Sequence, residues 1–162
     1  MAPRDVNGVV LVWVGRRGGA HLEALADEYS KRLARYLPLT QIRVPPAEGR
    51  GGDPRRALAR EKDAIVRHLA PGDTVVVLDE RGRERTTPEL AEWLRERTRV
   101  SRTAFVVGSD LGVDRELKAA SETMALSRLT LPHHLARLVL LEQLYRACDL
   151  LAGGQYHRGC LG

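Results

Sequence analysis

The feature that most constrains the fold is a regular alternation of short, β-branched apolar runs with segments of helical periodicity. Apolar runs of strand length occupy residues 8–14, 39–44, 74–78 and 103–107. Helical patterns lie between and after them, at residues 22–33, 53–69, 87–94 and 114–121. Strands that alternate with helices are typical of a mostly parallel sheet that is covered on both faces. The sequence therefore predicts an α/β fold, with residues 79–85 as a polar loop after the third strand.

The size and charge of the chain narrow its organisation and its partners. At 162 residues the chain is long enough for one sizeable core, which predicts a single domain over residues 1–162. Apolar residues at 43% and charged residues at 29% are ordinary for a soluble globular protein. The net charge of +5 suits a polyanionic partner such as nucleic acid, although many basic proteins have no such partner.

The sequence contains no pattern typical of a membrane span, a signal peptide or a metal site. No apolar run is long enough to cross a bilayer, and no basic start precedes an apolar core, so a cytoplasmic location without a membrane partner is the default expectation. Cys148 and Cys160 have neither Cys-x-x-Cys nor Cys/His spacing, and we expect no metal. Cys148 is expected to be a small core residue of the last helix.

Three loops follow predicted strands at the edge where open α/β sheets bind ligands. They come after Leu78, at Gly108–Gly112, and at residues 126–132. Glycines at the ends of the second loop would let its backbone approach a ligand closely, but they could equally serve a turn with positive φ. A glycine-rich turn at residues 15–19 lacks the Gly-x-Gly-x-x-Gly spacing of a dinucleotide site and is better explained as a tight turn.

The segment from Leu126 to Arg146 carries the most distinctive pattern. Its first part, with leucines at 126, 129 and 131, is expected to be buried, and Pro132 leads into an amphipathic helix. Arg137 and Arg146 fall off the apolar stripe of this helix and could be surface charges. The stripe is wide enough for a dimer interface, or it could pack into its own core; its members are Leu135, Leu138, Val139, Leu141, Leu144 and Tyr145.

The motifs Leu-Thr-Leu-Pro-His-x-Leu-x-Arg, Leu-x-Glu-Gln-Leu-Tyr-Arg-Ala and a closing Tyr-His-Arg occur in this order between Leu129 and Arg158. Together they resemble the RlmH family, SPOUT-class methyltransferases that modify N3 of a pseudouridine in bacterial 23S rRNA. The resemblance covers nearly the whole chain. It implies a homodimer joined through the last helix, S-adenosylmethionine as cofactor, the assembled ribosome as substrate, and a C-terminal trefoil knot, which pattern reasoning alone would never propose.

The resemblance also implies which positions hold the cofactor. The matching positions in the three loops are Leu78, Gly108, Leu126, Ser127, Arg128, Leu129, Thr130 and Leu131. One departure concerns the second loop, where the family usually has a second glycine and this chain has Ser109, followed by Asp110 and Leu111. Two alternatives therefore stay open: the same fold and cofactor with a different acceptor, or an RNA-binding module without catalysis.

Four side chains are candidates for the acceptor chemistry: His157, Tyr156, Arg158 and His133. Methylation at N3 requires loss of a proton, and a base with a pKa near neutrality would assist. His133 begins a helix whose dipole favours a neutral imidazole, although it could simply cap or pack there. In the tail, Tyr156 could stack on a base and Arg158 could pair with a phosphate; without the resemblance, such a tail would be interpreted as a disordered end.

Overall fold

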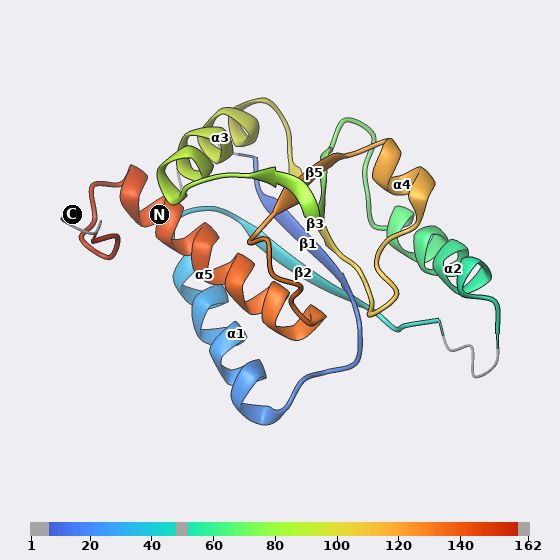
Figure 1. The fold of residues 1–162 in the computed structure, drawn as a ribbon. Coiled ribbons are helices and arrows are strands. Elements are labelled where there is room, and N and C mark those ends of the chain that lie inside the picture. The colour runs from blue at the N-terminus through green and yellow to red at the C-terminus, as the bar shows by residue number, and fades with distance from the viewer. Residues whose placement is uncertain (1–6, 48–51, 159–162) are drawn as a thin grey trace.

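A five-stranded parallel sheet forms the centre of the protein (Figure 1). The computed structural model describes residues 7–47 and 52–158. The strand order is β2-β1-β4-β3-β5, and all neighbouring strands run parallel. The strands are β1 (Val9–Val14), β2 (Leu39–Val44), β3 (Thr74–Glu84), β4 (Thr103–Val107) and β5 (Glu122–Ala125). The helices are α1 (Ala20–Leu33), α2 (Pro54–Val66), α3 (Thr87–Val100), α4 (Arg115–Ala119) and α5 (His133–Leu151).

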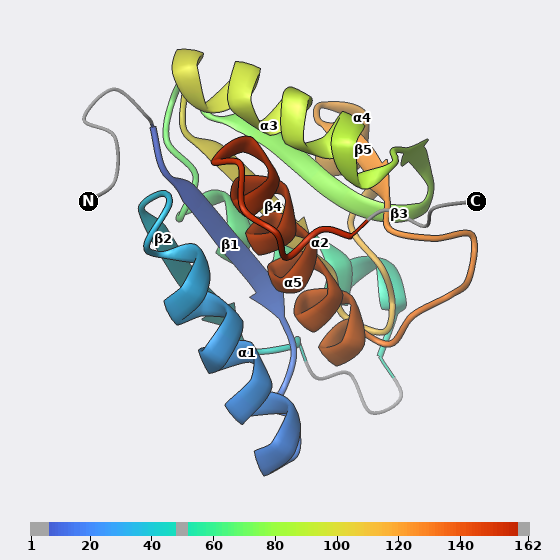
Figure 2. The same cartoon turned by 90° about the vertical axis from the view of Figure 1, so that its left-hand side faces the viewer.

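The predicted α/β fold with helices on both faces is confirmed. Odd-numbered residues of β1 join a core cluster with α1, α3 and α5, whereas even-numbered residues join a second cluster with α2 and α4. Figures 1 and 2 show this division of the helices between the two faces of the sheet. Every residue of β1 and β4 is buried, because side chains of a strand alternate between faces and both faces are covered.

Local capping explains where two of the helices begin. The Asp53 carboxylate accepts a hydrogen bond from the backbone N of Arg55 at 2.9 Å, and Pro54 is the first helical residue of α2, as predicted. α3 begins at Thr87, where its predicted helical pattern begins, and Thr86 is its N-cap. Thr86 and Glu89 form a reciprocal capping box.

Residues 79–84 do not form the polar loop expected from their composition; they extend β3. After a register shift beyond Leu78, Arg83 and Glu84 pair with residues of β5. Gly82 lies so close to this strand that a Cβ there would be 2.6 Å from the backbone N of Met124. The backbone of β5 supplies hydrogen-bond partners to this polar segment, and a single sequence window cannot reveal that neighbour.

The apolar face of α5 packs mainly into the core of its own chain. Leu140, Leu141 and Leu144 are fully buried, which favours the own-core alternative for these positions. Leu135 is 38% exposed and Leu138 is partly buried at the first turns, and Leu151 at the last turn is also 38% exposed, so both ends of α5 leave apolar surface at the solvent.

Two burial expectations were wrong: that the leucines at 126, 129 and 131 are buried, and that Leu25 lies on the inner face of the helical pattern at residues 22–33. Leu129 is 73% exposed, and Leu126 and Leu131 are only partly buried, because this segment forms the rim of a cavity and not a core strand. Leu25, placed on the inner face of α1 by its periodicity, is exposed.

Cys148 is buried in the core, as predicted, and burial raises the pKa of its thiol to about 12. Cys160 and the other residues after Arg158 lie outside the described residues. Within residues 7–47 and 52–158, no helix is long and apolar enough to cross a bilayer. The trefoil knot stays a prediction.

Candidate functional site

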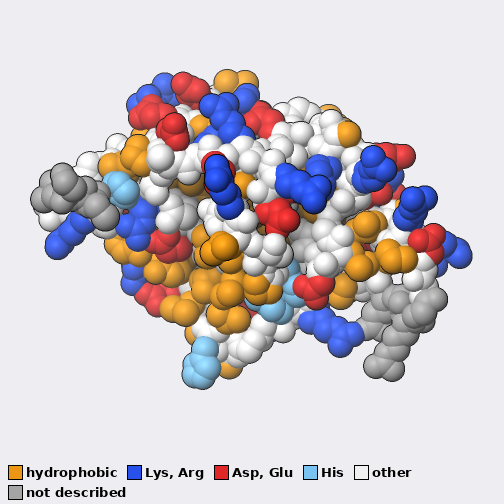
Figure 3. Space-filling model, viewed as in Figure 1, with side chains coloured by type: hydrophobic (Ala, Val, Ile, Leu, Met, Phe, Trp, Pro, Cys, Tyr) orange, Lys and Arg blue, Asp and Glu red, His pale blue; other side chains and the backbone are white. Residues whose placement is uncertain are grey.

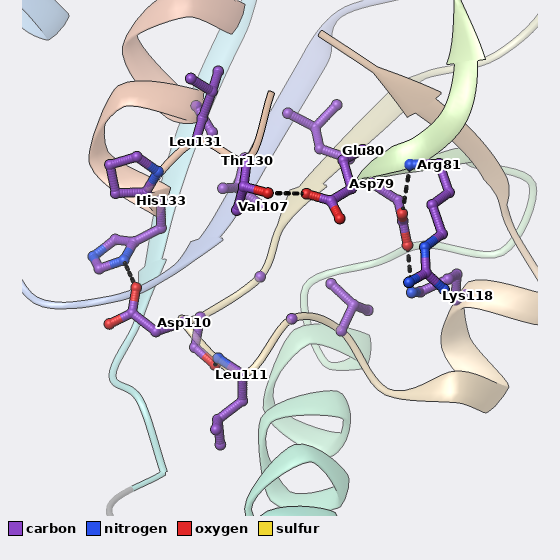
Figure 4. A pocket seen from close by; sticks show the side chains of 17 residues that line it. Asp79, Glu80, Arg81, Val107, Asp110, Leu111, Lys118, Thr130, Leu131 and His133 are labelled. Carbon is purple, nitrogen blue, oxygen red and sulfur yellow. Dashed lines mark hydrogen bonds and ion pairs between the residues drawn. The ribbon is translucent and has the colours of Figure 1, made fainter. Parts of the chain in front are cut away.

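A cavity of about 660 Å³ lies beyond the carboxyl end of β4, beside the middle of β3 and the first turn of α5 (Figure 4). Its walls are residues 78–81, residues 107–113, Lys118, residues 130–133 and Ala136. The three loops singled out in the sequence therefore meet around one space. This is the edge at which open α/β sheets place their ligands.

Seven of the eight positions expected to bind a cofactor line this cavity or an adjoining one of about 100 Å³. Leu78, Thr130 and Leu131 line both cavities, Gly108 lines the larger, and Leu126, Ser127 and Leu129 line the smaller. Arg128 is the exception. Its exposed side chain points to Glu84, with which it forms an ion pair of 3.2 Å.

The larger cavity has an apolar wall and a charged wall. Leu78, Leu131 and Ala136 provide apolar surface. On the other side Lys118 forms an ion pair with Asp79, and this contact holds the pKa of the Asp79 carboxyl below its usual range. Figure 4 shows this pair at one end of the cavity and His133 at the other. Such a mixture fits a small ligand that carries both an apolar ring system and charged groups.

Gly108 is required by the loop's own backbone. A Cβ at this position would lie 2.3 Å from the carbonyl oxygen of Gly112. Gly112 in turn has a φ of +88° and donates from its backbone N to the carbonyl of Ser109 at 2.8 Å. The positive φ explains Gly112, whereas close backbone approach explains Gly108. A side chain at Gly108 would therefore clash with the loop itself and not only with a bound ligand.

His133 is held on both edges of its ring. Its Nδ1 is 2.9 Å from the Asp110 carboxylate, and its Nε2 is buried without a hydrogen-bond partner. A Cβ at Gly15 would be 2.5 Å from that Nε2, so the ring fits tightly over the glycine. His134 packs on it with ring centroids 3.8 Å apart, and burial lowers the pKa of His134. These contacts favour a packing role for His133 over direct proton abstraction.

Tyr156 lies far from the cavity, at the other end of α5. Its hydroxyl is 3.2 Å from both the Tyr29 hydroxyl and a Glu142 carboxylate oxygen, and its ring centroid is 4.8 Å from that of Tyr145. The hydrogen bond with Tyr29, together with burial, raises the pKa of Tyr156. Its backbone N donates to Asp149 at 3.0 Å. The tail is thus anchored to its own helix.

The tail and the cavity do not meet within one chain. Tyr145, on which Tyr156 packs, follows His133 by twelve helical residues, which corresponds to about 18 Å along the axis. His157 is partly buried and Arg158 is exposed beside this anchor. The four candidates for acceptor chemistry are therefore divided, with His133 at the cavity and the tail residues at the far end.

Comparison with known proteins identifies the fold and the reaction class together. The family model "Predicted SPOUT methyltransferase" matches residues 8–157. The chain belongs to the SPOUT methyltransferase family. Two curated relatives named "Ribosomal RNA large subunit methyltransferase H" come from Gloeobacter violaceus and Anaeromyxobacter sp. strain Fw109-5. They are 42% and 45% identical, over 93% and 91% of this chain and 99% and 97% of their own lengths.

Solved SPOUT-like structures share the fold at low sequence identity. The SpoU methyltransferase AviRb from Streptomyces viridochromogenes, crystallised with its cofactor AdoMet, superposes with a TM-score of 0.50 at 12% identity. That match covers 94% of this chain and 61% of AviRb. TrmJ from Z. mobilis ZM4 gives a TM-score of 0.50 at 12% identity, over 96% of this chain and 72% of TrmJ.

Arg137 of this SPOUT protein is a structural residue that sequence reasoning left open as a surface charge. It is 6% exposed, and its guanidinium donates to both Glu23 carboxylate oxygens at 3.0 and 3.1 Å and to Gln41 at 3.1 Å. It also lies 4.3 Å from the centroid of the Trp13 ring. These contacts tie α5 to α1, β1 and β2, and so fix the helix that borders the cavity.

The sequence analysis also missed two residues that line or support the cavity wall, Asp110 and Glu61. Asp110 was noted only as a departure from the family pattern, yet it contacts His133. Glu61 lies almost fifty residues before the loop that it contacts, and no local pattern connects them. In the described part of the chain, no group of three or more His, Cys, Asp or Glu side chains could hold a metal ion.

Proposed function

We propose that this protein transfers the methyl group of S-adenosylmethionine to large-subunit ribosomal RNA, with N3 of a pseudouridine as the acceptor. The observation that carries the proposal is 42–46% identity, over nearly their whole length, to relatives named as ribosomal RNA large subunit methyltransferase H. In this proposal the 162 residues act as one catalytic domain in the bacterial cytoplasm, where ribosomes are found.

The cavity lined by residues 78–81, 107–113 and 130–133 is the proposed cofactor site. S-adenosylmethionine supplies a methyl group on a sulfonium centre and also carries an adenine, an ammonium and a carboxylate. The apolar wall of Leu78, Leu131 and Ala136 suits the adenine ring, and Glu80 is a partner for the ammonium. Arg81 is the cationic group proposed for the carboxylate, because Lys118 is already paired with Asp79.

The tail is the proposed acceptor side. His157 would take the N3 proton, because Nδ1 of His133 is engaged by Asp110, whereas Nδ1 of His157 has no hydrogen-bond partner in the described part of the chain. Arg158 is exposed and would pair with a phosphate of the RNA. Tyr156 would stack on a base only by leaving its present contacts with Tyr29 and Glu142, so we assign it mainly to holding the tail.

A homodimer would bring the tail to a cavity that it cannot reach in its own chain. We propose that each site combines the cavity of one subunit with the tail of the other. The exposed apolar surface supports an interface at the first turns of α5: Leu129 is 73% and Leu135 is 38% exposed, and Leu126 and Leu138 are partly buried. Figure 3 shows apolar side chains gathered over this part of the molecule.

Complementation between two inactive variants tests the composite site. One variant carries Ala136→Trp, which fills the cavity, and the other lacks the residues from Gly154 onward. Co-expressed in equal amounts, half of the dimers are mixed and each has one complete site, so methyl transfer to ribosomes should return to about a quarter of the parent rate. Recovery absent from verified mixed dimers would place cavity and tail in the same subunit.

A different acceptor with the same cofactor is the second candidate. Ser109 and Asp110 motivate it, because they depart from the family pattern at the cavity wall and both have specific contacts. Ribosomes from a strain without its own enzyme, followed by mapping of the methylated nucleotide, separate the two. Methylation of ribosomal RNA at another position would favour the alternative, and RNA binding without transfer would indicate a non-catalytic module.

A further inference from the structure

Ser109 stands in the cavity wall and bonds to a helix on the opposite side of its loop. Its Oγ donates to a carboxylate oxygen of Glu61 at 2.9 Å. The same Oγ accepts from the backbone N of Leu111 at 3.3 Å, inside the loop. This hydroxyl therefore connects the turn at the cavity with α2, which packs on the other face of the sheet from α5.

Glu61 is buried and shares its carboxylate between two loops. It is only 3% exposed, and its second oxygen accepts from the backbone N of Ala47, in the connection between β2 and α2, at 3.0 Å. A buried carboxylate depends on each of its hydrogen bonds, because removing one leaves a charged oxygen without water or donor. Loss of the contact with Ser109 should therefore cost more free energy than loss of an ordinary hydrogen bond from a surface hydroxyl.

The loop is braced from both faces of the sheet. Ser109 holds it toward α2, and the neighbouring Asp110 holds it toward α5 through His133 at 2.9 Å. The loop that these two contacts hold, Gly108 to Gly112, forms part of the cavity wall. A wall that binds a ligand through its backbone must keep those groups in a fixed direction, since misplaced donors and acceptors lose affinity.

We infer that Glu61 is a positioning residue for this wall, acting through Ser109. Glu61 does not line the cavity, so it affects the cofactor only by holding the loop. The inference rests on the proposed placement of S-adenosylmethionine in this cavity.

The test measures S-adenosylmethionine binding by calorimetry, and kcat and KM for methyl transfer to ribosomes, in Ser109→Ala, Glu61→Leu and the double variant. Losing one bond to a buried carboxylate should weaken cofactor binding and raise its KM about 10-fold, with kcat within about twofold of the parent. The double variant should be no worse than Glu61→Leu, because both changes remove the same hydrogen bond between Ser109 and Glu61. Ser121→Ala is the matched control, since its Oγ bonds to the Leu117 carbonyl away from the cavity.

Several results would overturn the inference. These are parent-like binding by Ser109→Ala, additive losses in the double variant, or a lower kcat with unchanged KM. If Glu61→Leu fails to fold, Ser109→Ala still decides, since it lies on a partly exposed loop. Ala136→Trp measured in parallel separates the two proposals: if it too binds like the parent, the cofactor lies elsewhere, whereas if it alone loses binding, only the role of Glu61 is wrong.

Discussion

At its first turn α5 borders a cavity, and at its last turns it carries a closed network of side chains. In the cavity, the wall opposite His133 includes charged groups, such as Glu80 and Arg81, that face a space large enough for a small molecule. Around Tyr156 the polar groups satisfy one another: Glu142 bonds to Arg146 at 2.9 Å and to the Tyr156 hydroxyl at 3.2 Å. The sequence had assigned both ends to the same reaction.

The difference separates a place that can bind a ligand from a place that holds a segment of chain. A cavity with converging polar groups can bind a ligand, whereas polar groups that already bond to one another offer few free donors or acceptors. At the tail end, the residues beyond the network, His157 and Arg158, are the ones left to act on another molecule. The following predictions test this contrast, beginning with the largest expected effect.

Removal of the tail from Gly154 onward should reduce methyl transfer to ribosomes by roughly 10²–10⁴-fold, the range expected for a positioned acid–base group. Cofactor binding should remain, because the groups proposed to bind S-adenosylmethionine belong to the cavity walls and none belongs to the tail. Single-turnover assays and calorimetry measure the two effects. His157→Ala and Arg158→Ala are controls that keep the Tyr156 anchor. If the truncated enzyme works at the parent rate, the tail has no role in methyl transfer.

Leu141→Glu should unfold the subunit, contrary to the simple expectation that it would only separate a dimer. Leu141 is fully buried in its own core, and a charge there costs about 3–5 kcal/mol. Leu135→Glu, on the exposed first turn, should leave the fold intact and weaken dimerisation. Chemical denaturation and light scattering of both variants measure this, and a folded, monomeric Leu141→Glu protein would contradict it.

Ala136→Trp should weaken binding of S-adenosylmethionine about 100-fold, because the added ring fills a site whose walls are otherwise well formed. The same substitution at Ala152, which is exposed at the other end of α5, is the matched control and should have little effect on cofactor binding. Calorimetry with both variants measures the contrast. Equal losses would mean that the two ends of the helix do not differ in the way proposed.

The smallest effect concerns the network end and its response to high pH. The hydrogen bond from Tyr36 to Asp149 raises the pKa of Tyr36 from 10.0 to about 12. The folded state therefore keeps a proton that the unfolded state loses, so this contribution is full below pH 10 and disappears as pH rises through about 12. Tyr36→Phe should flatten the fall in thermal stability between pH 10 and 12, and calorimetric scans of both proteins would reveal an unchanged slope if the bond does not matter.

Much of the fold was predictable because local pattern and tertiary environment agreed. The strands Leu39–Val44 and Thr103–Val107 begin and end where their apolar runs do, and the cap at Asp53 is local chemistry. The three segments around the cavity were also foreseeable, since parallel strands place their carboxyl ends at one edge, although the segment after Leu78 extends β3 and is not a loop. Where only neighbours decide, as for Arg83 and Glu84 beside β5, the prediction was wrong.

By itself the sequence determined the α/β architecture, the loops that meet at the sheet edge and, through its motifs, the resemblance to one methyltransferase family. Only the tertiary structure showed that Arg137 is buried against Trp13, that Glu61 holds Ser109, and that Tyr156 is anchored about 18 Å along α5 from the cavity. The physical reason is the separation along the chain over which each effect acts. Periodicity, capping and turn geometry act over a few residues, whereas these contacts join side chains that only the packing of helices on the sheet brings together.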